Sequence, residues 1–301
     1  MASNYHVPVL LNEVIDGLRI KPSGIYVDCT FGGGGHSAEI LKRLDTEGKL
    51  LAFDQDEDAR QNIPDDARVI FTGANFRHIS KFLRLYGIEK VDGLLADLGV
   101  SSHQFDTAER GFSTRFDATL DMRMDQRASA RASHVLQNYT EEKLQNIFEK
   151  YGEVTNAKTL ARCIVEARKT NALETINHFK NAIKEAVVGN PNKYLAKVFQ
   201  ALRIEVNDEM SALEELLQQL PAILKTGARA AIITFHSLED RMVKNFFRDG
   251  NFTGQQTDDV FGTKTKNTMR LINKKPIEAG ENETALNTRA RSARLRVAER
   301  L

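Results

Sequence analysis

The residues whose types and spacing could do chemistry begin with a glycine run and an acid. Four glycines at 32–35 follow the apolar run 25–27 and precede residues 37–42, which begin a predicted helix. Glycine lets a backbone approach a ligand closely and adopt positive φ. Asp54 follows Gly32 by 22 residues, at the end of the next apolar run. That is about the spacing at which a carboxylate ending the second strand binds a ribose diol.

Each of these two features also has a plainer interpretation. A glycine run can be only a tight turn, and Asp54 can be a solvated loop acid or a helix cap, because residues 56–58 are all acidic. The glycine turn lies at the expected spacing before Asp54, and this favours the interpretation of Asp54 as a ribose-binding residue. NAD and S-adenosylmethionine both carry a ribose, so the two features do not choose between these cofactors.

Further polar residues follow the next predicted strands. The apolar run 91–97 ends in Asp97, and the strand 68–72 leads into a loop that contains Phe76. Strand, turn and helix alternate here, which is typical of an open α/β sheet whose ligands bind at the carboxyl edge. Phe76 could stack on an adenine at this edge or be a core phenylalanine, and the pattern alone leaves both open.

The rest of the chain divides into three stretches. Residues 138–206 show helical periodicity without a strand, which interrupts the α/β pattern until it resumes near 210. We therefore predict a first part at 1–105, an arginine-rich loop and helical insertion at 106–206, and a second α/β part at 207–301. Within the insertion, 106–131 is charged and poor in apolar residues, which indicates a functional loop or lid. A last strand at 292–298 is predicted to point Arg294 and Arg296 outward.

Composition limits the classes of protein. The chain has 301 residues and a net charge of +1, so any nucleic-acid surface must be local. Its two cysteines, Cys29 and Cys163, form no disulfide framework or zinc spacing, which fits a reducing cytoplasm. No apolar run approaches the roughly 20 residues of a membrane span. Residues 1–6 show no export signal. We expect a cytoplasmic protein without a membrane partner.

Longer motifs carry a resemblance to a known family. They run in order over nearly the whole chain, at 28–37, 97–102, 109–113, 120–125, 199–204, 235–241 and 289–296. In these motifs the chain resembles the RsmH family, also called MraW. These are bacterial S-adenosylmethionine-dependent methyltransferases that modify N4 of a cytidine in the decoding centre, at the P site, of 16S rRNA in the small ribosomal subunit.

The resemblance implies a fold, ligands and residue roles. The fold is a Rossmann-like S-adenosylmethionine-dependent methyltransferase domain with an inserted all-helical domain. The product is S-adenosylhomocysteine, no metal is needed, and 16S rRNA, within the small subunit, is the partner; a homodimer stays open. The implied cofactor-binding residues are Gly34, Gly35, His36, Asp54 beside the ribose, Phe76 beside the adenine, Asp97 and Gln104.

Asp97 is also the candidate catalytic residue. The lone pair of cytosine N4 is delocalised into the ring, so attack on a methyl group needs acceptors for the amine hydrogens and an in-line approach. A carboxylate ending the fourth strand is well placed for this, although Asp97 could instead only orient the amino group of the cofactor. The target base must leave its stack, and Phe112, His103 or Phe235 could stack on it. His36 is expected to be a cofactor-loop residue rather than a general base. For His236, capping its helix could be the whole role.

Arginines are the predicted RNA surface. They lie in the 110–131 loop and at Arg289, Arg291, Arg294 and Arg296, where they can bind phosphate. The alternative is a solvated charged face, and Asp121, Asp125 and Glu239 are interpreted as ion-pair partners of nearby arginines.

Other functions are compared with this one. A NAD-dependent dehydrogenase would share the glycine turn and Asp54 but leave Asp97 and the arginines unexplained. A non-catalytic RNA-binding protein on the same fold, and a methyltransferase of another RNA or of a protein amine, are the remaining alternatives.

Overall fold

The chain forms two compact units in the computed structural model, which describes residues 8–254 and 267–301. Unit 1 is Met1–Gly99 with Ser211–Leu301, and unit 2 is Val100–Met210. The predicted absence of an export signal concerns residues 1–6, which lie outside the described residues. Among the described residues, no helix combines the length and apolar character that a membrane crossing requires.

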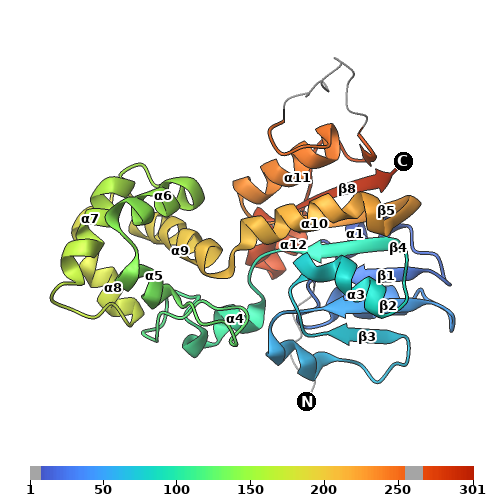
Figure 1. Cartoon of the computed structure of the whole chain (residues 1–301), viewed down its shortest axis with the longest axis horizontal. Coiled ribbons are helices and arrows are strands. Elements are labelled where there is room, and N and C mark those ends of the chain that lie inside the picture. The colour runs from blue at the N-terminus through green and yellow to red at the C-terminus, as the bar shows by residue number, and fades with distance from the viewer. Residues whose placement is uncertain (1–7, 255–266) are drawn as a thin grey trace. The chain divides into compact units, whose positions relative to one another are not determined.

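Unit 1 is built on one eight-stranded sheet with the order β3-β2-β1-β4-β5-β8-β6, with β7 also pairing with β8 (Figure 1). Neighbours from β3 to β5 are parallel, and β8 is antiparallel to β5, β6 and β7. This confirms the predicted open α/β sheet. The strands are β1 Ile25–Asp28, β2 Lys49–Phe53, β3 Val69–Thr72, β4 Val91–Asp97, β5 Leu224–Thr234, β6 Met269–Leu271, β7 Ile277–Glu278 and β8 Arg294–Arg300.

The strand order reverses between β1 and β4. In such a sheet the carboxyl ends of the strands beside the reversal flank a crevice in which ligands bind. The register pairs Asp28 with Leu95, and Asp97 with Ile233 of β5. Asp28 and Asp97 therefore lie at the same edge of the sheet, and Asp54 follows the end of β2 there.

Helices cover both faces of this sheet. The apolar core on one face includes residues of α3, α10 and α11, and that on the other face includes residues of α1 and α2. A doubly covered parallel sheet explains why its strands are almost continuously apolar. The helices around the sheet are α1 Leu11–Leu18, α2 Gly35–Leu41, α3 Ile79–Leu85, α10 Glu209–Ile223, α11 Ser237–Asp249 and α12 Glu281–Leu286, with 3₁₀ helices η1 Glu57–Asn62, η2 Phe76–His78 and η5 Thr288–Ser292.

Unit 2 is helical and has its own core. Its helices are α4 Ser102–Asp106, α5 Ala132–Asn138, α6 Glu141–Gly152, α7 Ala157–Ala167, α8 Ile176–Ala182 and α9 Pro191–Asn207, with 3₁₀ helices η3 Ala108–Arg110 and η4 Lys184–Ala186. Val100 and Phe105 pack against this core, so unit 2 begins before the predicted position 106. The core also includes Phe112, Leu120 and Met122. Residues 106–131 are therefore anchored in this core, and their predicted role as a functional loop or lid remains a prediction.

The last strand also differs from its prediction. β8 lies between β5 and β6, so it is an interior strand with both faces covered. Arg296 is consequently buried rather than pointing outward, with 3% of its surface exposed. Its Nε and Nη2 donate to the carboxylate of Asp240 on α11 at 2.6 and 3.0 Å. This pair joins the sheet to α11.

We predict that removing the carboxylate of this buried pair destabilises the protein strongly. Asp240→Ala leaves the Arg296 guanidinium buried without its partner, which should lower the free energy of unfolding by roughly 3–5 kcal/mol. Urea unfolding followed by circular dichroism measures this.

Two variants serve as controls for that measurement. Glu166→Ala removes an ion pair with Lys169 in which both side chains are 61% exposed, and should change stability by less than about 1 kcal/mol. The double change Asp240→Leu with Arg296→Met should recover most of the loss. Equal effects of Asp240→Ala and Glu166→Ala would contradict the assigned role of the buried pair.

Candidate functional site

The glycine turn joins β1 to α2 and requires glycine at two positions. Gly34 has φ of 74°, and a Cβ there would lie 2.9 Å from Cζ of Phe31. A Cβ on Gly35 would lie 2.3 Å from Cγ of Pro8. The turn is closed by a hydrogen bond of 2.7 Å from the Gly34 N–H to the Phe31 carbonyl. Side chains are thus excluded from the turn by its own geometry.

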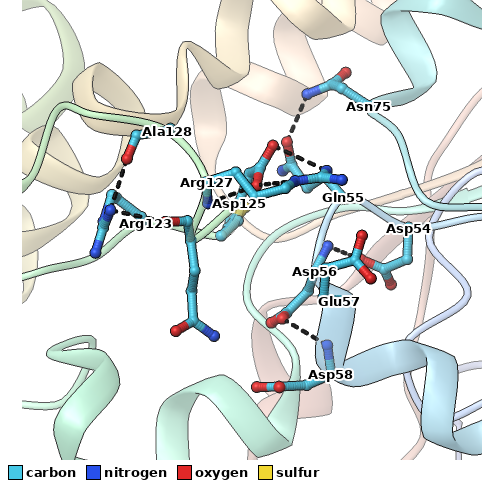
Figure 2. Close-up of polar contacts among 12 residues, drawn as sticks. Asp54, Gln55, Asp56, Glu57, Asp58, Asn75, Arg123, Asp125, Arg127 and Ala128 are labelled. Carbon is cyan, nitrogen blue, oxygen red and sulfur yellow. Dashed lines mark hydrogen bonds and ion pairs between the residues drawn. The ribbon is translucent and has the colours of Figure 1, made fainter.

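Asp54 ties this turn to the end of β2. Its Oδ2 accepts from the Gly32 N–H at 2.7 Å and its Oδ1 from the Asp56 N–H at 2.9 Å (Figure 2). Asp56, not Asp54, caps η1, so the helix-cap interpretation of Asp54 is wrong. Burial, with a smaller contribution from the charges of Asp56 and Asp28, raises the pKa of the Asp54 carboxyl to about 6, although the hydrogen bonds from the Asp56 and Gly32 N–H groups lower it. Such a carboxylate is stabilised by additional hydroxyl donors, as a ribose diol would supply.

The loop after β3 holds Phe76. Asn75 caps η2 by accepting from the Arg77 N–H, and its Nδ2 donates to Oε1 of Gln55 at 2.8 Å (Figure 2). Phe76 is partly buried against the core that contains α3. Its place beside an adenine remains a prediction.

Asp97 ends β4 and keeps one oxygen without a partner. Its backbone N–H donates to Oγ1 of Thr30 at 2.7 Å, which fixes the strand end against the β1 loop. Its Oδ1 is buried and accepts no hydrogen bond from any described residue. Burial raises the pKa of Asp97 to about 6; His36 lowers it, and the charges of Asp28 and Glu239 raise it.

The sequence did not single out Asp28 and Thr30, which support this arrangement. Asp28 is 1% exposed, and its carboxylate accepts from the Thr30 N–H at 3.1 Å and from Oγ of Ser37 at 2.8 Å. The signal that could have identified Asp28 is an acid directly before the glycine turn. Through Thr30, this buried carboxylate connects the turn with the end of β4.

The neighbouring strand β5 ends in the stretch that contains Phe235, His236 and Glu239. His236 caps α11 by accepting from the Glu239 N–H, which confirms the expectation that His236 could serve as a helix cap. Oε2 of Glu239 accepts from the Phe235 N–H at 2.8 Å, and Oε1 lies 3.1 Å from Nε2 of His236. Glu239 is therefore bound by backbone and imidazole groups of its own motif. Phe235 is partly buried in the core that includes α1.

Gln104, His103 and Phe112 belong to unit 2 and are described separately. Gln104 is buried in α4, and its Oε1 accepts from the Ser101 N–H in a capping box. His103 is exposed, and Phe112 is 6% exposed in the core of unit 2. A core position makes Phe112 a poor candidate for stacking on a base. The cofactor role of Gln104 remains a prediction.

Several arginines of the predicted RNA surface are buried or paired with acids of their own segment. Arg110 is buried and donates to the carbonyls of Arg123 and Met124. As predicted, Asp121 pairs with Arg123 at 2.7 Å. Asp125 pairs with Arg127 at 2.7 Å (Figure 2). The acids of this segment thus offset much of its positive charge.

The hydrogen-bond acceptors at the sheet edge of unit 1 fit a cationic nucleoside cofactor such as S-adenosylmethionine. The sheet edge contains the carboxylates of Asp28, Asp54 and Asp97, whose pKa values are all raised mainly by burial. A buried carboxylate oxygen without a donor, such as Asp97 Oδ1, is stabilised by an incoming ammonium or amine. Asp54 provides the acceptor for hydroxyl groups one strand away.

Comparison with known proteins shows the family of the chain. Residues 3–301 match the model of the MraW methylase family. Ribosomal RNA small subunit methyltransferase H of Phocaeicola vulgatus is 55% identical over 298 residues, which are 98% of this chain and 97% of that protein. The proteins of the same name from Parabacteroides distasonis and Cytophaga hutchinsonii are 54% and 53% identical, cover 99% and 98% of this chain, and are themselves covered to 98% and 99%.

The fold and site therefore define a Rossmann-like S-adenosylmethionine-dependent methyltransferase. The match over nearly the whole length shows, more narrowly, that the chain belongs to the MraW methylase family.

We predict that Asp97→Asn stabilises the ligand-free protein at alkaline pH. The Asp97 pKa is about 6 when folded against a reference value of 3.8, so the folded state binds the proton more tightly. Stability then falls as pH rises through this interval and stays lower above it. An uncharged asparagine removes this loss. The advantage of the variant in urea unfolding should be larger at pH 8 than at pH 4.5.

The control has the opposite sign. Arg68 lowers the pKa of Asp66 to about 2, so ionised Asp66 stabilises the folded protein above pH 4. Asp66→Asn should therefore be less stable than the wild type by nearly the same amount at pH 4.5 and at pH 8, and this difference should shrink only as the pH falls from about 4 to about 2. An Asp97→Asn protein whose difference from the wild type is the same at both pH values would contradict the assigned burial of this charge.

Proposed function

We propose that the protein transfers a methyl group from S-adenosylmethionine to N4 of a cytidine in the decoding centre, at the P site, of 16S rRNA in the small ribosomal subunit. The observation that carries this proposal is Asp97, which ends β4 with a buried oxygen that no described residue satisfies. The identity of more than half of all aligned residues with proteins named for small-subunit rRNA methylation supports the substrate class. Methylation of another RNA or of a protein amine is the alternative.

The residues of unit 1 divide the work of binding and orientation. When bound, the cofactor supplies a sulfonium-activated methyl group. Gly34, Gly35 and His36 would line its turn, Asp54 would accept its ribose hydroxyls, and Phe76 would lie beside its adenine. Gln104 of unit 2 would add a further contact. No residue of this set requires a metal ion.

Asp97 would hold the target amine. Its carboxylate can accept a hydrogen of the exocyclic nitrogen, which reduces the delocalisation of the nitrogen lone pair into the ring and directs it at the methyl carbon. Thr30 fixes the strand end that carries this carboxylate. The base must be unstacked to reach it, and Phe235 or His103 would then stack on the ring.

The RNA surface of unit 1 would lie beside β8. Arg294 opens β8 opposite Thr234, so η5 and Arg294 lie at the carboxyl edge of the sheet. Lys274, Lys275 and Arg291 are exposed, whereas Arg294 pairs with Glu278 and Arg296 is buried. The proposed phosphate-binding surface is therefore these lysines with Arg291, and Arg289 as a neighbour. Arg296 is withdrawn from it.

An enzyme of ribosomal RNA works where ribosomes are assembled, and this supports the proposal that the protein acts in the cytoplasm. We propose that the substrate is the small subunit rather than free rRNA. Whether the protein forms a homodimer is not part of this proposal.

The product of the reaction tests the function. The protein is incubated with tritiated S-adenosylmethionine and small subunits from a strain that lacks such an enzyme, and the rRNA is digested to nucleosides. We expect label in N4-methylcytidine, and a rate for Asp97→Asn lower by about 100-fold or more, since misplaced or lost amine acceptors cost that much. Label in another nucleoside, or in protein, would refute the cytidine assignment in favour of the alternative.

A second prediction concerns the basic surface. Lys275→Glu with Arg291→Glu should raise the KM for small subunits roughly tenfold at moderate salt and flatten its salt dependence, because fewer phosphate counterions are released. The kcat should change little. Lys49→Glu is the matched control, since Lys49 is exposed at the amino end of β2, at the opposite edge of the sheet. A KM that rises equally in the control would contradict a localised surface.

A further inference from the structure

The imidazole of His36 is held in one tautomer. Its side chain is 7% exposed on α2, and its Nε2 lies 3.0 Å from the carbonyl oxygen of Val9. A carbonyl oxygen only accepts, so Nε2 carries the hydrogen of this contact. In the neutral ring, Nδ1 is therefore an acceptor with its lone pair available. Nδ1 makes no hydrogen bond with any described residue.

This acceptor faces a second acceptor. Nδ1 of His36 lies 3.9 Å from Oδ2 of Asp97, which is too long for a direct hydrogen bond. The separation suits one nitrogen that donates a hydrogen to each atom at about 2.9 Å. Oδ1 of the same carboxylate is buried and unsatisfied. The pair is thus built to receive a group with at least two N–H donors.

Two further acids lie close enough to the pair to act on it electrostatically. Asp28 on β1 and Glu239 on α11 both act on Asp97, and Asp28 also interacts with His36. A proton that arrives between these carboxylates is stabilised there. Asp28 itself is bound by Thr30 and Ser37, so it stays in place as a fixed negative charge.

We propose that His36 and Asp97 together bind the target amine and that Nδ1 of His36 accepts the proton that this amine loses. The nitrogen forms its bond to the methyl carbon while the carbon–sulfur bond breaks and leaves its electron pair on sulfur. The methylated nitrogen is then positively charged, and its N–H bond breaks with the proton passing to Nδ1. The imidazolium that results lies beside the Asp97 carboxylate. This inference rests on the proposed function.

A second source of the same N–H chemistry is the α-ammonium group of the cofactor. An ammonium retains its proton at neutral pH and is satisfied by carboxylates, of which this edge has several. It has no need of an imidazole lone pair held towards the carboxylate. Methyl transfer to an amine, by contrast, must dispose of one proton, and an imidazole is suited to accept it near neutral pH. The structure therefore favours the target amine.

The experiment separates the two sources by kinetics. Rates of His36→Ala and His36→Gln are measured with small subunits at saturating S-adenosylmethionine from pH 5.5 to 9, and S-adenosylhomocysteine binding is measured by calorimetry. We expect kcat to fall by about 100-fold or more in both variants. The dependence of kcat on pH should differ between these variants and the wild type. Product affinity should change by less than about threefold.

His178→Ala is the matched control, since His178 is exposed on α8, and should keep the wild-type kcat. His36→Gln retains an N–H donor for the Val9 carbonyl, so it is expected to melt near the wild type and exclude misfolding as the cause. Variants that lose product affinity, or that recover full rate at high cofactor concentration, would show that the pair holds the cofactor ammonium and would overturn the proposal.

A spectroscopic readout is independent of turnover. Nitrogen-15 NMR of the histidines in the wild-type protein bound to S-adenosylhomocysteine should show the Nε2–H tautomer of His36 at pH 8. An Nδ1–H tautomer would overturn the inference whatever the rates. Fully active His36 variants beside an active wild type would overturn the inference alone, whereas a wild type that methylates no amine would overturn the proposed function and the inference together.

Discussion

The arrangement of unit 1 depends on burying carboxylates at one edge of a sheet with very few cations beside them. Asp28 is bound by Thr30 and Ser37, Asp54 by the Gly32 N–H, and Glu239 by the Phe235 N–H. Each of these acids connects two segments that are distant or sharply turned in sequence. Since N–H and O–H donors are directional, the carboxylates fix the glycine turn and the start of α11 in position. The reversal of strand order between β1 and β4 is what brings Asp28 and Asp97 to one edge.

This constraint has an energetic consequence. Burial raises the pKa values of Asp54 and Asp97 to about 6, which means that the folded, ligand-free protein holds these charges at a cost. Hydroxyl donors at Asp54 and an N–H donor at Asp97 would remove part of that cost on binding. Asp240 contrasts with them, because its carboxylate is paired with Arg296 and serves to join α11 to β8. The same residue type is thus structural where a cation is present and suited to binding where one is absent.

The sequence predicted those parts of the fold in which local pattern and tertiary structure agree. Apolar runs that end in Asp28, Asp54 and Asp97 became parallel strands with their acids on one edge, and the helical stretch became unit 2. The errors arose where burial depends on distant residues. Alternation could not reveal that Asp240 of α11 would meet Arg296 in the interior, and charge content hid the apolar side chains that anchor 106–131 in a core. The tautomer of His36 depends on the Val9 carbonyl, which no spacing rule connects with it.

The distribution of cations indicates how the two units would share substrate recognition. In unit 2, Arg110 is buried against carbonyl groups, and Arg123 and Arg127 are paired with acids of their own segment. These side chains stabilise the path of the chain, so their charge is already committed. In unit 1, Lys274, Lys275 and Arg291 are exposed beside β8, whose first residue lies opposite the end of β5. Phosphate binding and amine positioning would then both depend on the carboxyl edge of one sheet. Because Lys274 and Lys275 lie between β6 and β7, which both pair with β8, and Arg291 directly precedes β8, the pairing of β8 in this sheet would relate the phosphate contacts to the reactive base.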